Sequence, residues 1–316
     1  MDGCRQLHCF ADDNITCTLG HLRKDQCPEW QGSNDAPISA LPEAGQTLLP
    51  WSGSAMGPKD LNFLSGVGKP ITVAIVGPES AGKTTILGAF YQLLWQGKLT
   101  TDAHSFSNSY TLNGWEAVAS ALRWKPDTPP SFPPHTPSSE ARAPGMLHLG
   151  FRLENGSLRD FIFADAPGEW FQKWAIDERA ADAQGAAWIA RNADITLLVA
   201  DREALSGPKL GTARNDFQLL AQRTIANAHG RPIALVWTKG DLQVPPVLEA
   251  KIRSMVASVS PAVPEFTVSV HGADDGAVVD GFRQLFRWIL EAKRPGVNLP
   301  ATDAPGHDPL FRIGRR

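Results

Sequence analysis

Hydrophobic and polar positions follow two alternating patterns along most of the chain. Short apolar runs, such as 71–76 and 195–200, are followed by longer stretches in which apolar residues recur every three or four positions. The runs predict strands buried on both faces of a sheet, and the longer stretches predict amphipathic helices. Their alternation up to about residue 293 predicts an α/β fold with a mostly parallel sheet flanked by helices.

Six segments have the composition of strands, at 71–76, 146–153, 161–165, 195–200, 232–237 and 266–270. The dipeptide Asn155-Gly156 between the second and third predicts a tight turn and therefore an antiparallel hairpin. Helices are predicted at 83–96, 170–192, 216–228, 246–259 and 277–292. We therefore expect one α/β domain at 70–293.

Three segments lie outside this domain. Residues 1–30 are rich in Cys and His, residues 31–69 resemble a linker rich in Gly, Ser and Pro, and residues 294–316 form a tail. Within the domain, an insertion at 100–144 carries a short amphipathic stretch and then seven prolines between 126 and 144. These prolines exclude a helix or a central strand there.

Composition narrows the function classes. The chain has 316 residues, of which 42% are hydrophobic and 20% charged, so it can bury a large core and is not globally disordered. Lys and Arg number 30 against 33 Asp and Glu, a balance unlike that of a dedicated nucleic-acid binder. The sequence shows neither a membrane-spanning run nor an N-terminal signal peptide, which predicts a cytoplasmic protein.

The first motif with chemical content is Gly77-Pro-Glu-Ser-Ala-Gly-Lys83-Thr84, between a predicted strand and a predicted helix. This spacing is typical of a phosphate-binding P-loop, in which backbone N–H groups at a helix N-terminus surround phosphate oxygens. Lys83 is then expected to reach the β- and γ-phosphates, and the Thr84 hydroxyl to bind Mg²⁺. The predicted nucleotide contacts are Gly77, Glu79, Ser80, Ala81, Gly82, Lys83, Thr84 and Thr85.

Asp165-Ala-Pro-Gly168 follows the strand predicted at 161–165. A carboxylate at the end of a buried strand is suited to hold Mg²⁺, and the Gly168 N–H can turn towards a γ-phosphate. The alternative is an ordinary helix start, because Asp caps helices and Pro167 suits an early helical position.

Thr238-Lys239-Gly240-Asp241 follows the strand predicted at 232–237. A carboxylate at Asp241 can accept hydrogen bonds from the N1–H and the N2 amino group of guanine, donors that adenine lacks there. The methylene stem of Lys239 can lie along the base. The alternative is a simple turn after a strand.

Together, GPESAGKT, DAPG and TKGD resemble the ordered motifs of P-loop GTPases of the translation-factor-related class, which includes the small GTPases, over residues 70–293. In that class a further loop contacts guanine, and the similar place here is Ser269-Val270-His271, which departs from the usual Ser-Ala-Lys. The resemblance implies a GTP–GDP cycle with Mg²⁺ and a threonine of the first switch loop as a magnesium ligand. Thr136 is preferred over Thr128 for that role.

More closely, the chain resembles bacterial double-GTPase families associated with conflict and phage-defence systems. The shared features are the Cys/His-rich start, NGWEAV at 113–118, PPHT at 133–136 and DAPGEW at 165–170. Two GTPases are typically encoded side by side in such systems, so the resemblance implies a second GTPase as partner.

Glu169 stands where many small GTPases carry the glutamine that positions the attacking water. An ionised glutamate only accepts hydrogen bonds and adds negative charge beside a γ-phosphate. We therefore predict slow hydrolysis that an activating partner can stimulate, with Lys83, Glu169 and Thr136 as the catalytic residues. The sequence does not assign an arginine finger. Arg142 lies in the switch-like loop, where a solvated loop arginine is the favoured interpretation, and a partner protein can supply an arginine in trans.

The four cysteines, Cys4, Cys9, Cys17 and Cys27, all fall in the first 30 residues, with His21 as an alternative ligand. In a reducing compartment this cluster favours a structural zinc site over disulfides, although free cysteines remain the alternative. The sequence as a whole predicts a GTP-binding switch. A nucleotide-loaded scaffold without hydrolysis and an ATP-using P-loop enzyme are the other candidates.

Overall fold

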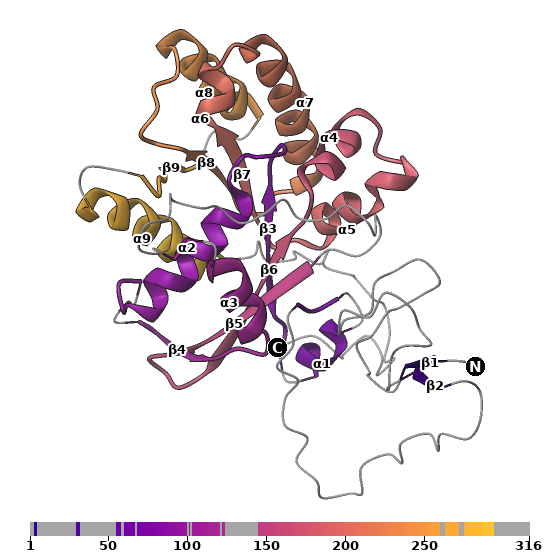
Figure 1. The fold of residues 1–316 in the computed structure, drawn as a ribbon, viewed down its shortest axis with the longest axis vertical. Coiled ribbons are helices and arrows are strands. Elements are labelled where there is room, and N and C mark those ends of the chain that lie inside the picture. Colours follow the sequence, from indigo (N-terminus) through magenta and orange to yellow (C-terminus); the bar gives the residue numbers. More distant parts are fainter. Residues whose placement is uncertain are drawn as a thin grey trace, which may run out of the picture. The chain divides into compact units, whose positions relative to one another are not determined.

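The computed structural model describes residues 3–4, 30–31, 55–57, 60–66, 68–99, 101, 103–120, 122–123, 145–259, 263–271 and 275–293. The chain divides into two units, Met1–Pro50 and Trp51–Arg316. In the first unit, strands β1 (Gly3–Cys4) and β2 (Trp30–Gln31) pair antiparallel. The second unit has the predicted α/β architecture (Figure 1).

A seven-stranded sheet crosses the second unit in the order β4-β5-β6-β3-β7-β8-β9. Its parallel part comprises β6 (Leu158–Asp165), β3 (Ile71–Val76), β7 (Ile195–Asp201), β8 (Ile233–Thr238) and β9 (Glu265–Thr267). The strands β5 (Gly145–Leu153) and β4 (His104–Asn108) extend it antiparallel. β5 and β6 form the predicted hairpin, in which Gly156 has a φ of 79° that suits glycine.

The prediction of a six-stranded sheet is wrong by one strand, because it missed β4 of the seven-stranded sheet. This strand lies at the sheet edge within the predicted insertion, and Phe106 pairs there with Phe151. Its sequence, HSFSN, is short and mostly exposed, so it has no apolar run to reveal it. Pairing with β5 after the chain has folded defines this strand, and local sequence preference does not.

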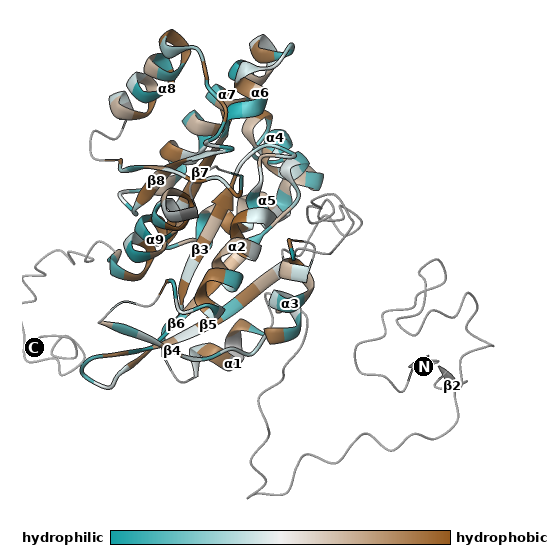
Figure 2. Cartoon of the chain, turned by 60° about the vertical axis from the view of Figure 1, so that its left-hand side comes forward, coloured by the Kyte–Doolittle hydropathy of each residue, from teal (hydrophilic) through white to brown (hydrophobic). Residues whose placement is uncertain are grey.

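Helices cover both faces of the sheet, and apolar residues concentrate along the strands between them (Figure 2). One hydrophobic cluster joins the sheet to α2 (Lys83–Trp95), α3 (Leu112–Ser120) and α9 (Asp275–Glu291). The other joins it to α4 (Gly168–Ile176), α5 (Gln184–Asn192), α6 (Arg202–Ser206), α7 (Leu210–Ala228) and α8 (Pro246–Val259).

The single helix predicted at 170–192 is wrong, because the chain breaks it into α4, a 3₁₀ turn η2 (Ala181–Ala183) and α5. Asp177 ends α4 in an extended conformation, and its carboxylate accepts a hydrogen bond from the Arg179 N–H at 2.9 Å. The break lets α5 fold back on α4. A Cβ on Gly185 would lie 2.3 Å from the Trp170 ring, so only glycine fits this contact.

Part of the segment predicted as a linker contributes to the core. Met56 exchanges two backbone hydrogen bonds with Met146 of β5, and α1 (Leu61–Ser65) buries Leu64 in the same cluster as α4. Among the residues that the structure describes, no helix is both long and apolar enough to cross a membrane.

Candidate functional site

The loop between β3 and α2 has the geometry that its glycines predict. Gly82 has a φ of 80° and Ser80 a φ of 59°, both in the left-handed region. Gly77 lies beneath the loop, where a Cβ would meet that of Val199 at 2.9 Å. This tight turn brings the loop to the first N–H groups of α2, which is the arrangement that binds phosphates.

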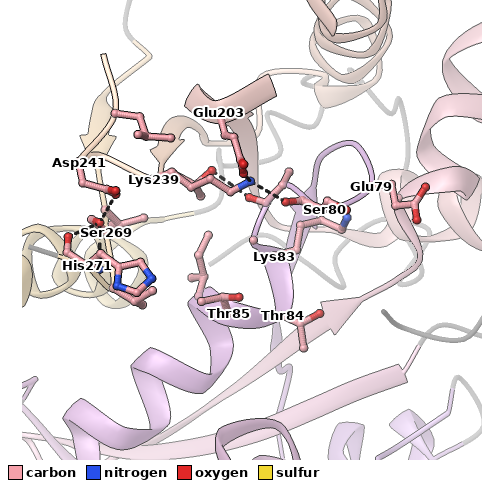
Figure 3. Close-up of a pocket in the computed structure, with 18 of the residues that line it drawn as sticks. Glu79, Ser80, Lys83, Thr84, Thr85, Glu203, Lys239, Asp241, Ser269 and His271 are labelled. Carbon is pink, nitrogen blue, oxygen red and sulfur yellow. Dashed lines mark hydrogen bonds and ion pairs between the residues drawn. The ribbon is translucent and has the colours of Figure 1, made fainter. Parts of the chain in front are cut away.

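A cavity of about 530 Å³ opens beside this loop at the carboxyl ends of the parallel strands (Figure 3). It brings together motifs that lie far apart in sequence, from Glu79 to His271. The predicted residues that line it are Glu79, Ser80, Ala81, Gly82, Lys83, Thr84, Thr85, Gly168, Glu169, Thr238, Lys239, Asp241, Ser269, Val270 and His271.

Lys83 begins α2 and is 6% exposed. Its Nζ donates a hydrogen bond to the Pro78 carbonyl oxygen at 2.8 Å, across the loop. Burial lowers the pKa of Lys83, while the nearby carboxylates of Asp165 and Glu79 oppose that shift. An anionic ligand in the cavity would restore the preference for the charged ammonium.

Thr84 and Asp165 meet at the base of the loop, where the Thr84 hydroxyl donates to Asp165 Oδ2 at 2.8 Å. Asp165 is buried at the end of β6, as the sequence predicts. A hydroxyl and a carboxylate oxygen at this distance are ligands of the kind that Mg²⁺ takes alongside phosphate oxygens and waters. The pair therefore fits a magnesium ion.

Gly168 opens α4 directly over the P-loop. A Cβ at this position would lie 2.2 Å from the Glu79 nitrogen, so no other residue fits without movement of the loop. Glu169 follows in the first turn of α4 and is exposed at the cavity. Glu79 lies at the opposite end of the cavity from Asp241 (Figure 3).

The loop after β8 is fixed from two sides. The Thr238 hydroxyl donates to the Ala81 carbonyl at 2.9 Å, which ties this loop to the P-loop. Gly240 donates its N–H to the Val268 carbonyl at 3.1 Å, which ties the loop to the segment after β9. Asp241 Oδ1 lies 2.6 Å from the Ser269 hydroxyl, so the weakly matching SVH segment does supply a partner for this carboxylate.

Sequence reasoning missed Asp201 and Glu203, which both bind Lys239 Nζ, at 2.9 and 2.6 Å. Asp201 is the last residue of β7, and Glu203 lies in the first turn of α6 and lines the cavity. The available signal was an acidic residue directly after the apolar run at 195–200. The same signal had singled out Asp165.

Several predicted residues lie outside the described part of the chain. These are Thr128, Thr136, Arg142, Cys9, Cys17, Cys27 and His21, and Cys4 is described only as backbone of β1. Within the described residues, no group of three or more His, Cys, Asp or Glu could hold a metal ion. The zinc site and the switch-loop threonine therefore stay predictions.

Three tryptophans of α4 and β8 are buried in the core. Trp174 and Trp237 are fully buried, and Trp170 is 3% exposed. Trp170 and Trp174 belong to the hydrophobic cluster that joins α4 to the sheet.

Comparison with known families identifies the chain. The model of the Double-GTPase 2 family matches residues 71–289, well over half of the sequence. The chain belongs to the Double-GTPase 2 family. The match runs from the first residue of β3 into α9 and includes the four loops around the cavity. It confirms the resemblance drawn from the motifs and supports a GTP-binding protein.

The Double-GTPase 2 match does not reach the Cys/His-rich first 30 residues or the tail. A comparison with curated proteins found no match.

Proposed function

We propose that the chain binds GTP with Mg²⁺ in this cavity and hydrolyses it slowly to GDP and phosphate. One observation carries the proposal. Asp241, held by Ser269, stands at one end of a cavity whose other end is the P-loop with Lys83. A carboxylate and an ammonium at opposite ends match a ligand with hydrogen-bond donors on its base and negative charge on its phosphates.

Asp241 supports the choice of guanine. Its carboxylate can accept from both the N1–H and the N2 amino group, and the Ser269 hydroxyl fixes its orientation. Adenine would leave this carboxylate without its two donors, which carries a penalty of about 1–3 kcal/mol for each unmade bond. ATP is therefore expected to bind much more weakly than GTP.

The phosphate end supplies charge neutralisation. Lys83 and the N–H groups of the P-loop would face the phosphates, and Thr84 with Asp165 would hold Mg²⁺. When bound, Mg²⁺ would neutralise charge on the β- and γ-phosphate oxygens. The Gly168 N–H would donate to the γ-phosphate, and Glu169 would accept a hydrogen bond from the attacking water. Thr136 is proposed to complete the magnesium site.

The slow rate follows from the charges around the cavity. Glu79, Glu169 and Glu203 line it together with Asp241, whereas Lys83 and Lys239 are the lysines among the described lining residues. Excess negative charge disfavours the build-up of charge in the transition state. We infer that a partner, either an activating protein or a second GTPase, supplies a cation and that the pair serves a bacterial defence system.

The test is nucleotide binding and phosphate release by the purified chain with Mg²⁺. GTP, ITP and ATP are compared, because ITP lacks only the N2 amino group. Asp241→Asn is expected to weaken GTP binding roughly a hundredfold, since each hydrogen bond to a charged group contributes about 1.5–3 kcal/mol. Asp182→Asn, at an exposed carboxylate paired with Lys173, is the matched control and leaves binding unchanged.

The outcomes separate the candidates. An affinity that decreases from GTP to ITP to ATP supports the guanine site. Equal binding of ATP, unaffected by Asp241→Asn, would mean that the loop after β8 is only a turn and that the cavity serves an ATP-using enzyme. Tight GTP binding without phosphate release in a single turnover would indicate a nucleotide-loaded scaffold.

A further inference from the structure

Lys239 lines the cavity, but its ammonium group is bound to three oxygens of the protein. Its Nζ donates to the Ser80 carbonyl at 3.1 Å, to Asp201 Oδ2 at 2.9 Å and to Glu203 Oε2 at 2.6 Å (Figure 3). A lysine ammonium has three N–H donors, and each has a protein acceptor here. The side chain therefore connects the P-loop, the end of β7 and the loop after β8.

Asp201 is the buried member of this group. Its side chain is 4% exposed, and its second oxygen accepts the Glu203 N–H at 2.9 Å, which starts α6. Both oxygens of the carboxylate are thus fixed before any ligand binds. Glu203 is 67% exposed, so its bond to Lys239 is screened by water and contributes less.

The turn that carries both acids is itself held on β8. Arg202, between them, is buried, lies 5.1 Å from the Trp237 ring and binds Glu249 at 2.9 Å. Trp237 directly precedes Thr238 and Lys239. The position of Asp201 relative to Lys239 is therefore set by packing that does not depend on the nucleotide.

Lys239 also has a strained backbone. Its φ of 53° is in the left-handed region, which costs a non-glycine residue roughly 1–2 kcal/mol. Burial alone would lower the pKa of Lys239, but its hydrogen bonds with Glu203 and Asp201 outweigh burial and raise it. The ammonium thus stays charged at neutral pH, and its bonds hold the strained conformation in place.

We propose that Asp201 and Glu203 are positioning residues for the nucleotide, acting through Lys239. They hold Lys239 as a bridge that fixes the spacing between the P-loop and the guanine-binding loop. Because its N–H groups are directed to protein, Lys239 serves the nucleotide through its methylene stem, and Lys83 is left to meet the phosphates. This inference rests on the proposed function.

The experiment is a double-mutant cycle on the full chain. Asp201→Asn removes the charge that binds Lys239 but keeps the start of α6, because Asn caps helices as well as Asp does. GTP and GDP affinities are measured for the wild type, Asp201→Asn, Lys239→Met and the double variant. We expect Asp201→Asn to weaken the binding of GTP and of GDP by the same factor, roughly tenfold, because the γ-phosphate is not involved.

Non-additivity decides the result. If Asp201 acts through Lys239, the double variant binds no more weakly than Lys239→Met alone. Independent, additive losses would assign Asp201 a purely structural role and overturn the inference, as would an unchanged affinity in Asp201→Asn. Glu203→Gln, at an exposed side chain, is the second variant if Asp201→Asn does not fold. Glu203→Gln is expected to lower the GTP affinity two- to threefold, and this loss should also disappear in the Lys239→Met background.

Two further variants separate this inference from the proposed function. Glu178→Gln removes an exposed carboxylate that pairs with Arg223, and it should leave both affinities unchanged. If Asp241→Asn still binds GTP selectively, the proposal that Asp241 recognises guanine is wrong. If Asp241→Asn loses selectivity while Asp201→Asn binds normally, only the positioning role fails.

Discussion

Gly168 lies against the backbone of Glu79, with room for a hydrogen but not for a methyl group between them. A Cβ on Gly168 would come within 2.2 Å of the Glu79 nitrogen and 2.4 Å of the Pro78 carbonyl carbon. These are backbone atoms that cannot rotate away as a side chain can. The start of α4 and the P-loop are therefore in direct mechanical contact.

Gly168→Ala should separate these two segments. We expect GDP to bind within a few-fold of wild type, while single-turnover GTP hydrolysis falls by at least roughly tenfold, or about 1.4 kcal/mol. The reason is that the Gly168 N–H can no longer approach the γ-phosphate. Gly211→Ala is the matched control, because nothing lies within 4 Å of its Cβ position. Normal hydrolysis in Gly168→Ala would mean that this contact plays no part in the reaction.

Thr84→Ala should change how nucleotide binding depends on magnesium. In the wild type, chelation of Mg²⁺ with EDTA is expected to weaken GTP binding, because Lys83 and the P-loop N–H groups would then have to neutralise the phosphate charge without the metal ion. In Thr84→Ala the affinity with Mg²⁺ should fall towards the chelated wild-type value, and EDTA should have little further effect. Calorimetry with and without Mg²⁺ measures both. An equal response to EDTA in the two proteins would exclude Thr84 as a ligand.

Glu169→Gln should accelerate hydrolysis. The substitution removes a negative charge beside the γ-phosphate and adds an amide that can both donate and accept. We expect the single-turnover rate to rise roughly tenfold, which corresponds to about 1.4 kcal/mol of barrier. Phosphate release with saturating GTP is the measurement. A lower rate would show instead that the carboxylate itself is needed to orient or deprotonate water.

Arg231 should contribute to stability without affecting the nucleotide. Its guanidinium donates to carbonyl oxygens at the ends of α5 and α7, those of Ala190, Arg191, Ala193, Asn227 and Ala228. Arg231→Met leaves these carbonyls without their donors, and we expect a loss of about 2–3 kcal/mol in the free energy of unfolding. Arg231→Lys should recover little of it, because an ammonium cannot span both helix ends. Urea denaturation and GTP affinity are measured together.

Asp194 should make stability depend on pH. Burial raises the pKa of Asp194. The hydrogen bond that its carboxylate accepts from the Thr72 N–H at 2.8 Å and the positive charge of Arg231 oppose this shift. A carboxyl whose pKa is raised by folding stabilises the protein fully below its unfolded pKa of about 3.9 and loses that contribution as the pH rises through the folded pKa. The free energy of unfolding of Asp194→Asn, taken relative to that of the wild type, should therefore increase as the pH rises from about 4 to about 7. A constant difference across that range would contradict the prediction.

Local chemistry made the cavity predictable. Each motif follows an apolar strand, and the carboxyl ends of parallel strands meet at one edge of the sheet, so their loops had to converge. The position of Lys83, Thr84, Asp165 and Asp241 at this edge could be predicted for that reason. Asp201 also follows an apolar strand, but its hydrogen bond with Lys239, 38 positions away, could not be predicted. No local pattern encodes that contact.

The errors in the fold have the same origin. β4 exists because β5 offers it a partner, and the helix predicted at 170–192 breaks because α5 must pack on Trp170. The periodicity of apolar residues predicts which positions are buried, but it does not predict where a helix ends and the chain reverses direction. Tertiary packing decided both cases.

The buried aromatic residues of α4 have a mechanical consequence. Trp170, Phe171 and Trp174 hold this helix as one stiff body, and Gly168 forms its end at the P-loop. Ile176, at the far end, is 74% exposed and lies about 12 Å along the axis, given a rise of about 1.5 Å per residue. A tilt of about 10° at Gly168 would carry Ile176 by about 2 Å, so a small displacement at the P-loop would become a larger one at the apolar far end of the helix.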